Sequence, residues 1–408
     1  MDKTKQIIEQ TEEYGAQNYS PLPIVLSHGE GCWVTDVEGR QYMDMLSAYS
    51  ALNHGHRHPR ILKALQTQAE QLTLTSRAFY NDQLGELCEE VAELCGMEKM
   101  LPMNTGAEAV ETALKLARKW GYESKGVPAH QAEIIVCDNN FHGRTISIVS
   151  FSTEPEYREP FGPLTPGFVV VPYGDSKALK AAITPNTVAF LYEPIQGEGG
   201  VVVPPEGYLS EATRICRENN VLVMADEIQT GMGRTGRWFC FQHEDATPDV
   251  IILGKALGGG VYPVSAVVST KEIMGLFRPG EHGSTFGGNP LGAAVAREAI
   301  RVLRDEKLPE RSQEMGEKFR DRLRDMNSPL LKEIRGKGLL IGVELHEEYG
   351  GAKPYCKALM KLGVLCKETR EHVIRFAPPL TLSDEELNWA MERIEKVLLH
   401  SEGVQTKA

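Results

Sequence analysis

The sequence lacks the features that indicate a membrane protein or a nucleic-acid-binding protein. No run approaches the roughly 18 apolar residues that a membrane span requires. The N-terminal stretch MDKTKQIIEQTEEYG contains no apolar segment typical of a signal peptide. Basic residues are in deficit, with 44 Lys and Arg against 56 Asp and Glu, so there is no excess of positive charge to bind phosphate backbones. We therefore expect a cytoplasmic protein whose partners are neither membranes nor nucleic acids.

Cysteine and histidine patterns for metal or redox sites are also missing. The eight cysteines are scattered without a CxxC pair, which favours reduced, buried thiols. The motif HGHRHP (54–59) suggests zinc at first sight, but no second cluster supplies a convincing fourth ligand. We expect no metal site. No GxGxxG motif follows an early strand, which argues against a nicotinamide-dependent dehydrogenase.

The hydrophobic pattern divides the chain into three parts. Residues 1–49 form an N-terminal arm that includes a predicted hairpin in GCWVTDVEGRQYMDML (31–46). In residues 50–290, predicted helices alternate with strands that are apolar throughout, which is typical of an α/β domain with a largely parallel sheet. Residues 291–408 predict a smaller α+β domain. The helices expected in the middle part are 59–71, 81–96, 107–121, 175–183 and 207–219, and the strands are 99–103, 133–138, 168–172, 187–193, 221–227, 250–255 and 264–270.

Two of the buried strands end in residues that can do chemistry. VLVMADE (221–227) ends in Asp226 and Glu227, and VIILGK (250–255) ends at Lys255, just before a glycine-rich loop. Burial of a carboxylate is costly unless it is paired, whereas a desolvated lysine gains nucleophilicity through a lowered pKa. Alone, the acid reads equally well as an ordinary strand end, and the lysine reads more simply as a surface lysine at a strand exit. Together they match the needs of pyridoxal 5'-phosphate (PLP), which uses an acid at its ring nitrogen and an amine at its aldehyde.

Two segments are candidates for a phosphate site. NTGA (104–107) lies between a strand and an amphipathic helix, where free backbone N–H groups attract an anion. A plain capped helix is the equally good alternative. GSTFGGNP (283–290) offers the hydroxyl groups of Ser284 and Thr285, although small-residue loops of this kind are common.

Four further residues follow strands or lie in glycine-rich motifs. Phe141 in NNFHGRT (139–145) can stack on a ring, and Arg144 in the same motif can bind a carboxylate in bidentate fashion. Glu198 lies in EPIQGEGG (193–200), and Arg375 lies in VIRFAPP (373–379). Taken singly, these residues read more simply as a core aromatic, a solvated acid and surface arginines.

The motifs, in this order, resemble the class-III aminotransferases of PLP fold type I. The similarity extends over residues 15–400 and is carried by NTGAEAVE, EPIQGEGG, ADEIQTGMGRTG, LGKALGGG and HGSTFGGNP. It implies a large domain with a mostly parallel seven-stranded sheet between helices, plus a smaller α+β domain. Within the family, YGAQNYSPLP (14–23), LTLTSRAFYND (72–82) and IRFAPPL (374–380) are most similar to members that act on ornithine.

The resemblance also implies roles for individual residues. Lys255 matches the lysine that bonds to PLP, and Asp226 matches the acid at its ring nitrogen. The other residues that match cofactor-binding positions are Gly106, Ala107, Phe141 and Gln229, with Ser284 and Thr285 on a loop that reaches the phosphate of the neighbouring subunit of a homodimer. Ala107 brings no hydroxyl group, so backbone donors must serve there.

For the substrates, the resemblance implies L-ornithine and 2-oxoglutarate. Tyr19 and Arg144 match the residues that hold the α-carboxylate of ornithine, and Tyr49 lines the same pocket. Glu198 matches an acid that pairs with Arg375 while ornithine reacts and releases Arg375 for 2-oxoglutarate. The implied products are glutamate 5-semialdehyde, which cyclises to pyrroline-5-carboxylate, and L-glutamate.

Several alternatives remain open at this point. Acetylornithine or 4-aminobutyrate would suit a different member of the same family. A PLP-dependent racemase or mutase would share the fold but would not require 2-oxoglutarate. A non-enzymatic nucleotide-binding or scaffold protein would leave Lys255 and Asp226 incidental and would carry no chromophore.

Overall fold

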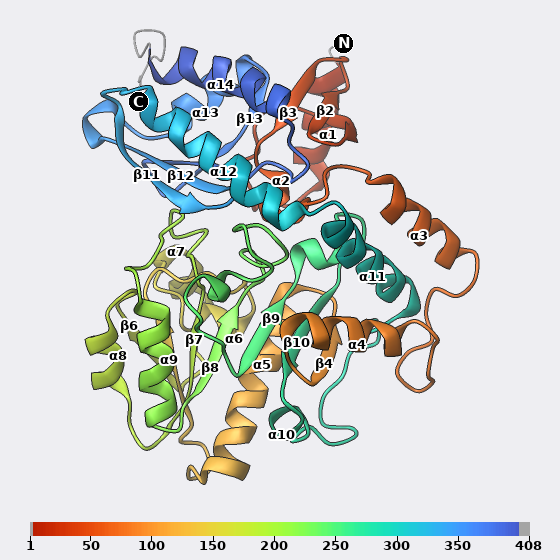
Figure 1. Ribbon diagram of the computed structural model, residues 1–408, viewed down its shortest axis with the longest axis vertical. Coiled ribbons are helices and arrows are strands. Elements are labelled where there is room, and N and C mark those ends of the chain that lie inside the picture. The colour runs from red at the N-terminus through yellow and green to blue at the C-terminus, as the bar shows by residue number, and fades with distance from the viewer. Residues whose placement is uncertain (1–2, 400–408) are drawn as a thin grey trace.

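A seven-stranded sheet forms the centre of the larger part of the computed structural model, which describes residues 3–399 (Figure 1). The strands lie in the order β4 (Lys99–Met103), β10 (Ser265–Ser269), β9 (Val250–Leu253), β8 (Leu222–Asp226), β7 (Thr187–Tyr192), β5 (Glu133–Cys137) and β6 (Phe168–Val171). β10 runs antiparallel to both of its neighbours, and the pairs from β9 to β6 are all parallel. The mostly parallel seven-stranded sheet is therefore confirmed.

Helices cover both faces of this sheet, which explains why its strands are apolar throughout. Along β5, Ile134 and Val136 belong to the core under α5 (Gly106–Trp120), whereas Ile135 and Cys137 belong to the core under α8 (Ser176–Ala182) and α9 (Tyr208–Glu218). Side chains alternate between the two faces of a strand. Each face must therefore be apolar when both are buried. Near β9 and β10, α4 (Leu84–Cys95) and α11 (Pro290–Asp305) complete the cover.

The C-terminal part is built on a smaller antiparallel sheet. Its order is β11 (Leu331–Lys337), β12 (Leu340–Leu345), β15 (Val373–Phe376) and β14 (Lys367–Thr369). The helices α12 (Leu308–Asp325), α13 (Lys353–Lys361) and α14 (Asp384–Leu398) accompany it. A capping box of Ser383 and Glu386 begins α14, because each side chain satisfies a free N–H group of the first turn. This α+β arrangement agrees with the expected smaller domain.

The N-terminal strands lie beside the C-terminal part rather than beside the large sheet (Figure 1). After α1 (Lys3–Tyr14), the strands β1 (Leu26–Glu30), β2 (Trp33–Asp36) and β3 (Gln41–Asp44) form a sheet that β13 (Val364–Leu365) extends. The predicted hairpin at 31–46 corresponds to β2 and β3. The predicted domain boundaries at residues 49/50 and 290/291 stay a prediction.

A buried arginine joins the part built on the large sheet to the C-terminal part. The Arg234 guanidinium is fully buried and donates to the Leu339 and Pro378 carbonyl oxygens and to Asn53 Oδ1, at 2.9, 2.6 and 2.6 Å. Burial lowers the pKa of Arg234 to about 9. The buried guanidinium is thus held by hydrogen bonds to neutral oxygens, where a carboxylate partner would be usual.

The histidines of HGHRHP point to three separate partners. His54 Nε2 lies 3.0 Å from the Ala299 carbonyl oxygen, His56 Nε2 lies 2.8 Å from Asp44 Oδ2, and His58 Nε2 lies 3.0 Å from Glu306 Oε1. These contacts attach the N-terminal segment to α11 and to its own β3.

No helix between residues 3 and 399 combines the length and apolarity needed to cross a membrane.

Candidate active site

The parallel strands deliver the chemically important residues to one edge of the large sheet. Asp226 ends β8, Glu193 follows β7, the segment 139–144 follows β5, and Lys255 follows β9. A cavity of about 140 Å³ opens there. It is lined by Gly106, Ala107, Phe141, His142, Gly143, Glu193, Ile195, Asp226, Ile228, Gln229, Thr230 and Lys255. Ligands of such sheets bind beyond the carboxyl ends of their strands.

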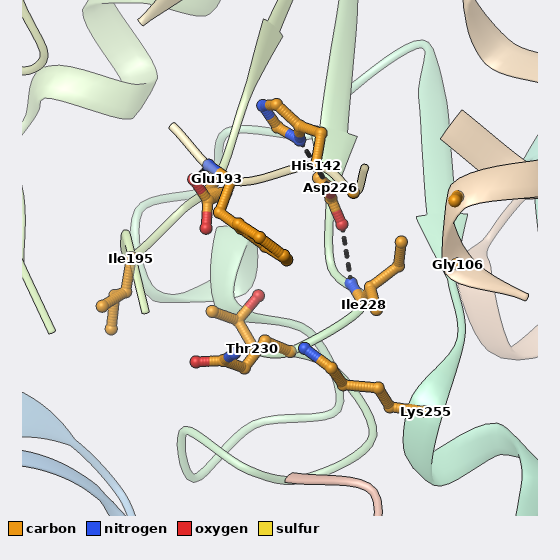
Figure 2. A pocket seen from close by; sticks show the side chains of 12 residues that line it. Gly106, His142, Glu193, Ile195, Asp226, Ile228, Thr230 and Lys255 are labelled. Atoms are coloured by element: carbon orange, nitrogen blue, oxygen red, sulfur yellow. Dashed lines mark hydrogen bonds and ion pairs between the residues drawn. The ribbon is translucent and has the colours of Figure 1, made fainter. Parts of the chain in front are cut away.

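Asp226 is held firmly at the inner wall of this cavity. The residue is 5% exposed, its Oδ2 lies 2.6 Å from His142 Nδ1, and its Oδ1 accepts a 3.0 Å hydrogen bond from the Ile228 N–H (Figure 2). Burial alone would lower the pKa of His142, but the hydrogen bond and charge of Asp226 raise it. The contact with Asp226 therefore favours the protonated form of His142.

Lys255 enters the same cavity from a strained backbone position. Its φ of 45° lies in the left-handed region, which residues other than glycine rarely adopt. Burial lowers the pKa of Lys255, although Glu198 and Asp226 oppose this shift. The amine points into the same space as the Asp226 carboxylate (Figure 2). A buried amine with a lowered pKa is available in its neutral, nucleophilic form.

The start of α5 leaves backbone donors for an anion. The Thr105 side chain caps the N–H of Glu108, and the Glu108 carboxylate accepts from the N–H groups of Asn104 and Thr105. Within residues 3–399, the N–H groups of Gly106 and Ala107 have no such partner. Both residues line the cavity, so these donors suit a phosphate group.

The loop with Ser284 and Thr285 lies at the outer side of this helix start. Ser284 Oγ accepts hydrogen bonds from Asn104 Nδ2 at 2.8 Å and from the Gly287 N–H at 3.0 Å. Thr285 is exposed. The expected contact of this loop with the phosphate of a neighbouring subunit stays a prediction.

A second, larger cavity of about 590 Å³ adjoins the first and shares Phe141 with it. Tyr49, Glu198 and Arg375 are among its lining residues. Arg375, 1% exposed on β15, donates to Glu198 Oε1 at 2.6 Å, and its guanidinium lies 4.9 Å from the centre of the Tyr49 ring. Burial would raise the pKa of Glu198, but Arg375 outweighs burial and holds the pKa below its usual value. The two residues therefore form an ion pair.

Arg144 and Tyr19 lie at the outer part of the site. The Arg144 guanidinium lies over two aromatic rings, 3.5 Å from the centre of Tyr157 and 5.5 Å from the centre of Phe141. Tyr19 is 79% exposed and lines neither of the two cavities. The structure thus brings Phe141, Arg144 and Tyr49 around the cavities, while Tyr19 and Thr285 remain at the surface of the single chain.

Three residues of the site carried no assigned role in the sequence. His142 contacts Asp226, Tyr157 contacts Arg144, and Glu193 Oε2 accepts a 3.0 Å hydrogen bond from the Phe141 N–H. Burial raises the pKa of Glu193 to about 7. The position of His142 and Glu193 directly after strand ends was an available signal, whereas nothing local pointed to Tyr157.

The residues of the first cavity fit PLP. An acid stands on one wall, free backbone donors stand at a helix start, and a buried amine enters from the loop after β9. The buried Gln229 Oε1 also has no hydrogen-bond partner among residues 3–399. An unpaired buried polar atom beside a cavity suggests that a ligand supplies the missing contact.

Comparisons with known proteins agree with this chemistry. The sequence profile of the aminotransferase class-III family matches residues 14–398. Ornithine aminotransferase of Brevibacillus brevis is 62% identical over 398 residues, which cover 98% of this chain and 99% of that protein. Ornithine aminotransferase of Bacillus subtilis is 60% identical and covers 98% of each chain.

Two solved structures extend the comparison. Ornithine aminotransferase of Toxoplasma gondii, a structure described as having partial occupancy of PLP at the active site, matches with a TM-score of 0.97 and 48% identity over 99% of this chain and 96% of that one. Acetylornithine aminotransferase of Elizabethkingia anophelis matches with a TM-score of 0.89 and 48% identity over 98% of this chain and 100% of that one.

Proposed function

Because this chain belongs to the class-III aminotransferase family, we propose that it acts as an ornithine aminotransferase. The reaction transfers the δ-amino group of L-ornithine to 2-oxoglutarate and gives glutamate 5-semialdehyde and L-glutamate. Full-length identity of 60–62% to relatives named ornithine aminotransferase carries this assignment. The ion pair between Glu198 and buried Arg375 fits an enzyme that binds ornithine and 2-oxoglutarate in turn through different carboxylate contacts.

We propose that PLP binds in the first cavity. Asp226 would hold the ring nitrogen, Phe141 would stack on the ring, Gln229 would contact the phenolic oxygen, and the N–H groups of Gly106 and Ala107 would bind the phosphate. When bound, PLP supplies an electron-withdrawing ring that stabilises negative charge on the carbon that loses a proton.

The chain's own residues then hold and move protons. Lys255 Nζ, whose pKa burial lowers, would take a proton from the δ-carbon of ornithine. Asp226 keeps a proton on the ring nitrogen of the cofactor. His142 holds the Asp226 carboxylate in place at 2.6 Å and is thus a positioning residue.

Arg144 and Arg375 would each bind one substrate carboxylate. Arg144, Tyr19 and Tyr49 receive the α-carboxylate of ornithine, so that the δ-amine reaches Lys255. Glu198 meanwhile occupies Arg375, at 2.6 Å, and prevents ornithine from binding there in the opposite orientation. When 2-oxoglutarate binds, Arg375 takes its α-carboxylate and Arg144 takes the other one. Glu198 thus contributes to specificity by disfavouring the wrong binding orientation of ornithine.

We further propose that the enzyme is a homodimer with shared active sites. Phe79, Tyr80 and Phe286 are large apolar side chains exposed on the single chain, and Tyr19 is exposed as well. A second copy would cover such apolar surface and would bring Ser284 and Thr285 to the partner's phosphate.

We also propose that the protein is cytoplasmic. All eight cysteines are free and seven of them are buried, which fits the reducing cytoplasm.

Incubation of the purified protein with L-ornithine and 2-oxoglutarate tests the proposal. Pyrroline-5-carboxylate forms a yellow adduct with o-aminobenzaldehyde, and we expect this adduct only when both substrates are present. N-acetylornithine and 4-aminobutyrate should give little glutamate. A protein coloured by PLP that forms no adduct but converts N-acetylornithine would overturn the choice of ornithine. Turnover of ornithine without any need for 2-oxoglutarate would favour a racemase or mutase.

A further inference from the structure

Arg144 has no carboxylate partner in the described part of the chain. Its guanidinium forms no ion pair or hydrogen bond among residues 3–399, and its contacts are with the rings of Phe141 and Tyr157. An exposed arginine of this kind ordinarily samples many conformations, because its long side chain has many accessible rotamers. Something must therefore hold Arg144 in place for carboxylate binding to be efficient.

The Tyr157 ring provides that restraint. The guanidinium carbon lies 3.5 Å from the centre of the Tyr157 ring, a stacking distance, and 5.5 Å from the centre of Phe141. Stacking on a ring face uses the cation–π attraction and leaves the in-plane N–H donors free. Those donors are the ones that bind a carboxylate in bidentate fashion. Both rings that contact Arg144 line the larger cavity, so the guanidinium lies next to residues that border the substrate space.

We propose that Tyr157 is a specificity-determining positioning residue, which holds Arg144 by stacking so that its donor edge is ready for the α-carboxylate of ornithine. The inference rests on the proposed function and adds a residue to it. Phe141 cannot replace Tyr157 in this role, because its ring is farther from the guanidinium and also borders the first cavity.

An ion pair from the small sheet holds Tyr157 in turn. Tyr157 lies in the single turn α7 (Pro155–Arg158), and Glu154 immediately precedes this turn. Glu154 Oε2 accepts from Arg370 at 2.6 Å, and Arg370 also donates to Asn139 Oδ1 at 3.0 Å. Arg370 lies between β14 and β15. This tether connects the turn that carries Tyr157 to the segment between β14 and β15.

The test compares two substrates that share the reacting amine but differ in the carboxylate. L-ornithine carries the α-carboxylate, and 1,4-diaminobutane lacks it. For Tyr157→Leu we expect KM for ornithine to rise about tenfold, as expected for the loss of a stacked cation–π contact, with little change in kcat. The kcat/KM for 1,4-diaminobutane should not change. Tyr157→Phe keeps the ring and should behave like the wild type.

A double-mutant comparison separates positioning from general damage. In an Arg144→Leu background, Tyr157→Leu should raise KM no further, because there is no guanidinium left to hold. Additive effects, or equal losses with 1,4-diaminobutane, would overturn the proposal. Thermal unfolding of the holoenzyme checks that Tyr157→Leu is folded; if it is not, the same comparison with Tyr157→Gln decides.

The tether has its own matched pair of variants. Glu154→Gln should raise KM for ornithine about threefold, since a freed turn weakens the stack without removing it, whereas Glu159→Gln on the adjacent exposed turn should leave KM unchanged. Wild-type conversion of ornithine is measured first. Its absence would refute the proposed function, while normal wild-type conversion with an unchanged KM in Tyr157→Leu would refute only the role of Tyr157.

Discussion

Replacing Glu198 by alanine should weaken the preference of the enzyme for the δ-amine of ornithine. In the structure, Glu198 accepts a 2.6 Å hydrogen bond from Arg375, whose side chain is 2% exposed. Any substrate carboxylate that binds Arg375 must first displace Glu198. The alanine variant removes this competition, so ornithine can bind with its α-carboxylate on Arg375 and its α-amine toward Lys255.

The geometry sets the size of the effect. A hydrogen bond to a charged group contributes about 1.5–3 kcal/mol. At about 1.4 kcal/mol for each tenfold change in an equilibrium constant, the affinity of Arg375 for a carboxylate should rise roughly tenfold to a hundredfold. The KM for 2-oxoglutarate should fall, and a measurable share of ornithine should react at its α-amine.

Isotope labelling reads this share directly. Ornithine labelled with ¹⁵N at the δ-position gives labelled glutamate by δ-transfer and unlabelled glutamate by α-transfer, and mass spectrometry separates the two. Glu344→Ala is the control, because Glu344 also pairs with an arginine, Arg335, but lies outside the substrate cavity. If Glu198→Ala leaves both the label ratio and the KM for 2-oxoglutarate unchanged, the gating argument is wrong.

Three further predictions concern the catalytic amine, a buried acid and a strained turn. Lys255→Ala should reduce turnover at least about a thousandfold while circular dichroism and the unfolding temperature show an intact fold. Burial raises the pKa of Glu193 from 4.5 to about 7. The contribution of Glu193 to the free energy of unfolding of the apoprotein is therefore fully present below pH 4.5 and is lost as the pH rises from 4.5 through 7. Urea unfolding at pH 4 and pH 8 measures this loss, and in Glu193→Gln the difference in free energy of unfolding between the two pH values should be smaller than in the wild type by up to about 3 kcal/mol. An equal difference in variant and wild type would contradict the assignment. Ala48→Gly should raise the free energy of unfolding by about 0.5–1 kcal/mol, because exposed Ala48 has a φ of 45° that glycine adopts without steric cost; a loss of stability would argue against backbone strain there.

The strand ends were predictable because each apolar run ends at a charged residue that can take part in catalysis. The predicted strands at 221–227 and 250–255 are β8 and β9, and they place Asp226 and Lys255 on one edge. Boundaries were less predictable. The helix expected at 81–96 begins at Leu84, because Asn81 Oδ1 accepts from the N–H groups of Gln83 and Leu84 and forms a turn first.

Contacts between segments that are distant in sequence were not predictable. His142 and Asp226 are 84 residues apart, and their 2.6 Å contact depends on how the strands are ordered in the sheet. Four consecutive residues, Ser47–Ser50, have φ between 45° and 73° and turn Tyr49 toward Arg375. Left-handed turns without glycine leave no signature in sequence, since local propensity disfavours them. The two-residue strand β13 is equally invisible before its pairing with β3 is known.

The buried Arg234 constrains the order in which the protein can be completed during its synthesis. Its acceptors Leu339 and Pro378 follow it by 105 and 144 residues. At about 5–20 residues per second, translation needs roughly 7–30 s to deliver the Pro378 carbonyl. Until then the guanidinium has to remain hydrated, because burial of an unpaired cation is prohibitive. The interface between the large sheet and the C-terminal part therefore closes only after nearly the whole chain has been synthesised.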